Sequence, residues 1–376
     1  MILRLNQWIL VVCCVALFVG PASAQKGGGS PAEPSVKYNI NWLGNPRGFV
    51  DLYSGSYYPH DMNNAGHIVG IVEDYTGLTP YYSAFVLYTA QAGMIDLNNS
   101  LFFPAITEWS SQGWTAHSAD GINDNGQMAV RMRKIVDGVV TQGLFRYDPP
   151  SLAVPAGMFA LIQGAGVCNK AAINKLGDIA FTSNLVGGIC SWMLHSTGGV
   201  VSIPIAGTVM ALNNSRQIVG ASNGSLVRYD SGTGTTLVLG LTGSQKAGIN
   251  SIGEVAFPLN VPKGRGVETK PARFSGGVLQ ILRDSGHATD INSEGDVCGS
   301  MGSSLFVFPR QGGTVVVDRE VTGSPTDVNK WNIAAMKSVA EINDRNSTGF
   351  GQVCGAAWVP NGFGYYRSEL FLLTPF

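Results

Sequence analysis

Short apolar stretches alternate with turn residues along the chain, and one combination of the two recurs seven times. Each copy ends a strand with Met, Ile or Leu, continues with an asparagine, and starts a new strand with an apolar and then a small residue. A turn glycine follows the asparagine by three residues in most copies. This pattern predicts a β-hairpin corner that is repeated along the chain. The copies are DMNNAGHIVG (61–70), GINDNGQMAV (121–130), AINKLGDIAF (172–181), ALNNSRQIVG (211–220), GINSIGEVAF (248–257), DINSEGDVCG (290–299) and EINDRNSTGFGQVCG (341–355).

The asparagine of each copy is predicted to close its turn with its own side chain and not to bind a ligand. Arg216 replaces the turn glycine in the fourth copy, and the turn of the seventh copy is longer. We expect these two corners to be less regular than the others. The asparagines are Asn63, Asn123, Asn174, Asn213, Asn250, Asn292 and Asn343.

Two further apolar segments follow each corner, so each unit has four predicted strands. The strand-like segment 36–44 has no unit before it, and segment 369–376 is a third strand with no fourth strand after it. The first segment is therefore predicted to complete the unit of the second. The expected fold is all-β, a seven-bladed β-propeller of four-stranded antiparallel blades over residues 36–376. An open β-solenoid is the alternative, but it predicts more uniform spacing and capping units.

The N-terminal segment has the pattern of a secretory signal. Arg4 precedes an apolar run from Trp8 to Gly20, and a small-residue cleavage site follows at 22–24, so residues 1–24 are interpreted as a signal peptide. Residues 25–35 are rich in Gly, Ser and Pro and are expected to be a flexible lead-in. No later segment is apolar enough to predict a membrane span. A secreted protein, extracellular or periplasmic, is therefore expected.

The repeated phrase I-N-x-x-G-x-I-V-G, the strand Ser83-Ala84-Phe85 and the segment LFLLTP (370–375) resemble the bacterial extracellular repeats of the HAF family. The resemblance covers nearly all of the chain after the signal segment, but the His that gives the family its name is absent. It implies export and a repeat fold. It implies no activity, because the family has none assigned.

Charge and motifs exclude several classes of function. The formal net charge is −1, and no basic stretch predicts nucleic-acid binding. No nucleophile elbow, zinc-protease motif or phosphate loop is present, so no catalytic residue and no cofactor is predicted. Residues 290–296 have the opening spacing of a calcium loop, but other copies carry apolar residues there, and no metal is predicted. Histidines and carboxylates before the corners leave a metal or acid–base site open as a minor alternative at His60, His117, His287, Asp61, Asp120 and Asp290.

Four cysteines follow the signal segment. Cys298 and Cys354 occupy the small-residue position of two successive copies, so they are interpreted as buried thiols. Cys168 and Cys190 are left as a possible disulfide, which an oxidising compartment would permit.

Strand parity places the long loops on one face of a propeller, because successive connections alternate between its two faces. Aromatic residues concentrate in the long loops of the seventh, first and second units, where they either bind a ligand or pack among themselves. The favoured function is a binding or structural module of the envelope or extracellular space, expected as a monomer, whose partner is a glycan or a protein surface. An extracellular propeller hydrolase or lyase with an unrecognised site is the alternative. The predicted ligand-binding residues are Tyr57, Tyr58, Tyr81, Tyr82, Trp109, Trp114, Trp331 and Tyr365.

Overall fold

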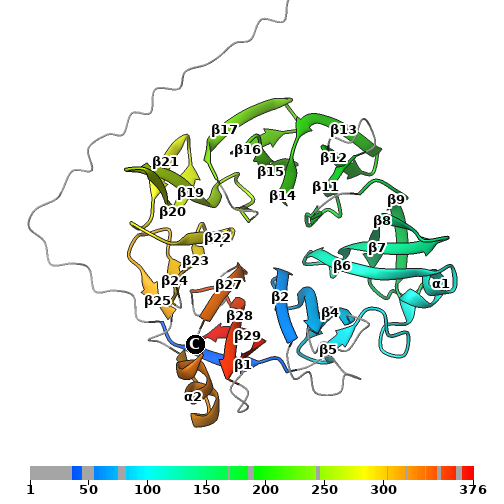
Figure 1. The fold of residues 1–376 in the computed structure, drawn as a ribbon, viewed down its shortest axis with the longest axis horizontal. Coiled ribbons are helices and arrows are strands. Elements are labelled where there is room, and N and C mark those ends of the chain that lie inside the picture. Colours follow the sequence, from blue (N-terminus) through cyan, green and yellow to red (C-terminus); the bar gives the residue numbers. More distant parts are fainter. Residues whose placement is uncertain are drawn as a thin grey trace, which may run out of the picture. The chain divides into compact units, whose positions relative to one another are not determined.

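Seven β-sheets are arranged as blades around a central axis in a computed structural model of the protein (Figure 1). Six sheets have four antiparallel strands in sequence order, and the seventh has five strands. The predicted seven-bladed propeller is therefore confirmed. The structure describes residues 36–44, 55–74, 82–167, 170–184, 190–242, 246–302, 304–317, 321–334, 336–344, 349–360 and 366–376.

The first strand of each blade lies innermost, at the central axis (Figure 1). Blade 1 contains β2 (Gly55–Met62), β3 (Ile68–Asp74), β4 (Tyr82–Thr89) and β5 (Gly93–Asp96). Blade 2 contains β6 (Trp114–Ile122), β7 (Met128–Val136), β8 (Val139–Asp148) and β9 (Met158–Gln163). Blade 3 contains β10 (Ala172–Ile173), β11 (Ile179–Ser183), β12 (Ser191–Ser196) and β13 (Gly199–Ala206).

The next three blades repeat this order. Blade 4 contains β14 (Thr208–Leu212), β15 (Gln217–Ser222), β16 (Ser225–Asp230) and β17 (Thr235–Leu241). Blade 5 contains β18 (Gly248–Ile249), β19 (Val255–Lys263), β20 (Gly266–Ser275) and β21 (Val278–Ile281). Blade 6 contains β22 (His287–Ile291), β23 (Val297–Met301), β24 (Ser304–Phe308) and β25 (Val315–Val316).

Blade 7 joins the two ends of the described chain. It contains β27 (Met336–Ile342), β28 (Val353–Pro360) and β29 (Tyr366–Pro375), and the N-terminal strand β1 (Tyr38–Trp42) pairs antiparallel with β29. Ile40 lies opposite Leu373, and Trp42 lies opposite Phe371. The predicted closure of the ring by the N-terminal strand is therefore confirmed.

The connection between blades 6 and 7 contains two elements that the sequence pattern did not predict. Strand β26 (Val321–Thr322) pairs parallel with β1 as a fifth strand of blade 7. Helix α2 (Pro325–Ile333) follows; Ser324 caps it by accepting a hydrogen bond from the Asp327 backbone N–H. A shorter helical segment, η1 (Pro104–Ile106) and α1 (Thr107–Ser111), lies between blades 1 and 2.

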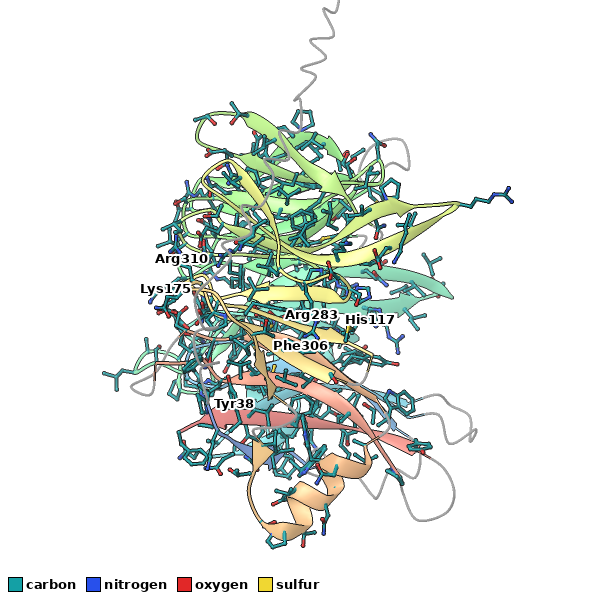
Figure 2. The ribbon with its side chains drawn as sticks, turned by 90° about the vertical axis from the view of Figure 1, so that its left-hand side faces the viewer. Tyr38, His117, Lys175, Arg283, Phe306 and Arg310 are labelled. Atoms are coloured by element: carbon teal, nitrogen blue, oxygen red, sulfur yellow. The ribbon has the colours of Figure 1, made fainter. Side chains whose placement is uncertain are left out.

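The two faces of the ring carry different connections. The corner face carries the asparagine corners between the first and second strands and the turns between the third and fourth. The loop face carries the hairpins between the second and third strands and the connections between blades. Figure 2 shows Lys175 and Arg310 at the corner face and His117 toward the other side.

Each corner packs a small residue against neighbouring backbone, as the sequence predicts. All seven residues at the small position are fully buried: Val69, Ala129, Ala180, Val219, Ala256, Cys298 and Cys354. The glycine that often follows lies opposite a β-bulge in the innermost strand; a Cβ on Gly299 would be 2.2 Å from the His287 carbonyl oxygen. The fourth corner is regular, contrary to expectation, because Arg216 adopts the positive φ of 58° that glycine has elsewhere.

The hydrophobic core is divided among the interfaces between blades. In the interface between blades 3 and 4, for example, the fully buried Trp192 packs in one cluster with Val209 and Ile218. Each blade therefore contributes to two clusters and depends on both neighbours. Among the described residues, no helix combines the length and the apolar character needed to cross a membrane.

Candidate functional site

The corner asparagines form a belt around the corner-face end of the central channel. The Oδ1 atom of Asn123 accepts hydrogen bonds from the backbone N–H groups of Asn125 and Gln127, both at 3.0 Å, and so closes its own turn. Its Nδ2 atom donates a hydrogen bond of 2.8 Å to the Asn174 carbonyl oxygen in the next blade. Similar bonds between blades start from Asn63, Asn174, Asn213 and Asn292. These side chains act in folding, and their polar atoms are occupied by the protein itself.

The residues that follow the asparagines line the channel mouth on the corner face. A cavity of about 360 Å³ lies there. Its polar side chains also connect neighbouring blades: the Asn64 backbone N–H donates to Asp124 Oδ1, and that of Lys175 donates to Asn214 Oδ1, both at 2.9 Å. This mouth is polar, but its side chains largely satisfy one another.

Ionisable residues line a second, deeper part of the channel, which we call the charged section. It comprises Asp61, Lys170, Asp290 and Glu341, which surround a cavity of about 120 Å³, and Lys246, whose Nζ atom lies 3.8 Å from Glu341 Oε1. The three carboxylates stand two residues before the corner asparagines, on the loop-face side of the belt. After ring closure these three come from the successive blades 6, 7 and 1.

β-Bulges help to place the ionisable groups of the innermost strands. Pairing of β2 with β3 shifts between Pro59 and Asp61, and pairing of β22 with β23 shifts between Ala288 and Asp290. A bulge inserts an unpaired residue and redirects the side chains next to it. His60 is the residue inserted in β2; its Nδ1 atom lies 2.8 Å from the Ala119 carbonyl oxygen in blade 2.

Two carboxylates of the charged section, and Asp120, which lines the same cavity, also hold adjacent blades together. Asp61 Oδ2 accepts a hydrogen bond of 2.8 Å from the Ile122 N–H in blade 2, and Asp290 Oδ2 accepts one of 3.1 Å from the Ile342 N–H in blade 7. Asp120 binds Arg131 through both carboxylate oxygens and accepts a bond from the Ala171 N–H in blade 3. These acids therefore have a structural role in addition to their charge.

Burial shifts the protonation of these groups. It raises the pKa of Asp61 to about 6, opposed by Lys170, and it lowers the pKa of His60 to about 4. Burial also raises the pKa of Asp290. The pKa of Glu341 is raised well above its ordinary value, first by burial and then by the Asp290 carboxylate. We infer that a protonated Glu341 donates the hydrogen bond that joins it to Asp290.

Asp120 shows the opposite shift. Burial acts to raise its pKa, but the charge of Arg131 and the hydrogen bonds from that guanidinium outweigh burial, and the pKa is lowered. Asp120 therefore stays ionised and paired. The carboxyls whose pKa values are raised, Asp61, Asp290 and Glu341, form part of the charged section.

The structure brings together only part of the His and Asp set considered from the sequence. His60 lies beside the charged section, whereas His117 packs edge-on against Phe85 and His287 is exposed at the start of β22. Within the described ranges, no three His, Cys, Asp or Glu side chains are placed to hold a metal ion.

The structure buries two members of the predicted aromatic ligand patch. Tyr57 and Trp331 are buried, 3% and 1% exposed, so the expectation that they face a ligand is wrong for both. Trp331 lies on the inner side of α2 and packs against Trp42 and Phe371, because the helix needs an apolar anchor on blade 7.

The remaining members of the patch divide into four groups. Trp109 and Trp114 are half-buried, and their rings lie 4.8 and 5.2 Å from the Phe145 ring between centroids, so they stiffen blade 2. Tyr58 is exposed at 43%. Tyr82 begins β4, and only its backbone is described. Tyr81 and Tyr365 lie outside the described residues.

The cysteines fall partly within the described chain. Cys298 and Cys354 are fully buried free thiols, as the sequence predicts, and burial raises their pKa well above the ordinary value. Cys190 is a half-buried free cysteine. Cys168 lies outside the described residues, so the bridge between these two stays a prediction.

Sequence reasoning missed Glu341, Lys170 and Lys246 as site residues. The signal was present in the first letter of each repeated phrase, which is Asp, Gly, Ala, Ala, Gly, Asp and Glu in order. The three acidic residues at this position, Asp61, Asp290 and Glu341, come together only when the ring closes.

No protein-family model matches the chain, and no curated protein matches it.

Proposed function

We propose that this protein is an exported, non-catalytic binding module, and that its ligand site is the charged section of the central channel. One observation carries the proposal. Ionisable side chains from blades 1, 2, 3, 6 and 7 line one cavity, and Lys246, which precedes blade 5, lies beside Glu341. The fold nevertheless accepts Ala172, Ala211 and Gly248 where Asp61, Asp290 and Glu341 stand. Burying ionisable groups opposes folding, and strongly perturbed pKa values concentrate at functional sites.

The size of the site restricts the ligand. A cavity of about 120 Å³ holds roughly four water molecules, at about 30 Å³ for each in the liquid. It accommodates the end of a ligand and not a folded domain. Carboxylates and ammonium groups together accept and donate hydrogen bonds, which suits the hydroxyl-rich end of a glycan. A polar peptide terminus offers similar groups and is the second ligand class.

Export is part of the proposal and rests on the N-terminal sequence. Residues 1–24 carry the basic start, apolar run and small-residue site of a signal peptide, and they lie outside the described residues. The envelope or extracellular space is the compartment that such a signal predicts. A glycan ligand is abundant there.

A hydrolase or lyase is the second candidate, favoured by the Asp290 and Glu341 pair. Two adjacent carboxyls whose pKa values are both raised, that of Glu341 well above its ordinary value, are groups from which general acid–base catalysis can be built. Against this, Asp290 and Asp61 already accept backbone N–H groups of neighbouring blades. A binding site can use these carboxyls while they keep their bonds to neighbouring blades, so we favour binding over catalysis.

The test is a glycan array probed with residues 25–376. Glu341→Gln removes the ionisable group with little change of shape, and Glu268→Gln changes a carboxylate on the β20 hairpin that is remote from the channel. The proposal predicts array signals that the wild type and Glu268→Gln share and that Glu341→Gln loses. Signals that survive Glu341→Gln, or no signal from the wild type, contradict the glycan site. Cleavage products of a bound glycan, detected by mass spectrometry and absent with Glu341→Gln, favour the enzyme.

A further inference from the structure

The hairpin between β7 and β8 ends in a cluster of exposed aliphatic side chains. Ile135, Val136, Val139 and Val140 are between 50% and 65% exposed and flank the turn residues Asp137 and Gly138. Single exposed aliphatic residues are ordinary, but four at one hairpin tip are a concentration of exposed apolar side chains.

The tip is apolar on both faces of the hairpin. Ile135 lies opposite Val140, and Val136 lies opposite Val139. Because successive side chains in a strand point to opposite faces, the two pairs occupy opposite faces. A flat protein partner would cover one pair and leave the other in water. A medium that surrounds the tip, such as the hydrocarbon of a lipid layer, covers both.

Basic residues stand directly behind this tip. Arg133 and Lys134 precede the aliphatic residues on β7, and neither forms a salt bridge within the described part of the chain. Asp137 is the one acidic residue at the tip, so the charge there is positive. Basic residues next to an apolar insertion complement the negative headgroups of anionic lipids.

Two other hairpins on the same face carry related residues. The β19–β20 hairpin of blade 5 presents the exposed Arg265 and Val267, and an exposed Lys263 that pairs with Glu268. Strands β28 and β29 of blade 7 present the exposed Trp358 and Tyr366. Tryptophan and tyrosine concentrate at membrane interfaces because each has an apolar ring and a polar group.

These three hairpins are distributed around the ring, in blades 2, 5 and 7. All of them connect a second strand to a third strand, so they belong to the loop face, and Figure 2 shows the hairpins of blades 2 and 5 extending on the side of His117. Three separated contacts define a plane, which is the shape of a lipid surface.

We propose that the loop face docks on an anionic lipid surface, with the β7–β8 tip inserted among the lipids and with the β19–β20 hairpin, Trp358 and Tyr366 resting at the headgroups. The proposal goes beyond ligand binding in the channel and does not depend on it. Glu341→Gln leaves the hairpins unchanged and is expected to bind vesicles like the wild type.

The test is co-sedimentation of residues 25–376 with large unilamellar vesicles of phosphatidylcholine and phosphatidylglycerol in equal parts, and with phosphatidylcholine alone. Val136→Ser/Val139→Ser removes apolar surface from the tip. The matched control, Val201→Ser/Val238→Ser, changes residues 59% and 64% exposed on the outer strands β13 and β17. Arg133→Gln/Lys134→Gln tests the charge, and thermal unfolding checks that each variant is folded.

We expect the wild type to sediment with the anionic vesicles and to be released as salt rises. The tip variant is expected to lose about tenfold or more in partition coefficient, in line with the apolar surface removed, and the control variant is expected to match the wild type. Equal loss in the tip and control variants, or no sedimentation of the folded wild type with anionic vesicles, overturns the proposal. Sedimentation that is independent of the tip shows a different docking surface and overturns it equally.

Discussion

The side-chain amide of Asn63 donates a hydrogen bond of 3.0 Å to the backbone carbonyl of Asn123, across the boundary between blades 1 and 2. Corresponding bonds join other neighbouring blades, so the corner asparagine has two tasks. Its oxygen closes the turn of its own blade, and its nitrogen holds the next blade. These two tasks explain the asparagine at the five corners where the bond between blades is present.

Replacing Asn123 separates the two tasks. Asn123→Ala removes two turn bonds and the bond to Asn174, and we expect it to lower the free energy of unfolding by about 2–4 kcal/mol. Asn123→Asp keeps the acceptor and loses only the donor, and it is expected to lower that free energy by about 1–2 kcal/mol. Chemical denaturation measures both values. An alanine variant as stable as the wild type would contradict a structural role for the belt.

Replacing Tyr38 is expected to raise the free energy of unfolding, whereas replacing Asn123 is expected to lower it. Its hydroxyl is buried in blade 7 and has no hydrogen-bond partner among the described residues. Removing it in Tyr38→Phe is therefore expected to raise the free energy of unfolding by about 1 kcal/mol. The matched control is Tyr88→Phe, which removes a hydroxyl that accepts a bond from Asn41 and should lower stability slightly. If Tyr38→Phe is less stable than the wild type, the hydroxyl has a partner in solution.

The aromatic residues of the loop face are expected to divide by burial. Trp114→Ala removes a ring packed against Phe145 and should lower the free energy of unfolding by about 2–3 kcal/mol. Tyr58→Ser, at an exposed position, should change it by less than about 1 kcal/mol. Differential scanning calorimetry of both variants checks this order. If Trp114→Ala leaves the melting temperature unchanged, the Trp114 ring does not stabilise the fold and becomes a candidate ligand contact again.

The fold could be predicted from the sequence because its determinants are local and repeated. Seven corners, four apolar segments for each corner and the incomplete units at the two ends define the ring and its closure. Helix α2 could not be predicted in this way. It consists of few turns, and Trp331 anchors it by contact with Trp42, which is distant in sequence.

The candidate site was harder to predict for two physical reasons. Asp61, Asp290 and Glu341 occupy equivalent positions in their repeats, but only ring closure makes them neighbours. The bulges that help to place them depend on pairing within each blade. Aromatic side chains misled the prediction because Tyr57 and Trp331 suit a core as well as an exposed loop, and their burial is decided by tertiary packing.

The pH dependence of stability reports on the charged section. The raised pKa of Glu341 means that the folded protein holds a proton that the unfolded chain releases near pH 4.5. The associated stability is complete below that pH and is lost as pH rises through the folded pKa. Asp61 likewise contributes stability that is lost as pH rises from 3.8 to about 6. His60 acts in the opposite direction: its contribution is present above pH 6.5 and is lost as pH falls through about 4.

Comparing the wild type with Glu341→Gln at the same pH isolates Glu341 from these other groups. The measurement that tests the central claim most directly is therefore the free energy of unfolding of both proteins at pH 5 and pH 8, with Glu268→Gln, at a half-buried carboxylate outside the channel, as the control. If the charged section is retained for binding and opposes folding, Glu341→Gln is more stable than the wild type at pH 8, and its advantage shrinks at pH 5. A Glu341→Gln variant that is less stable than the wild type at pH 8 would show that the carboxylate supports the fold, and it would contradict the assignment of the charged section as a ligand site.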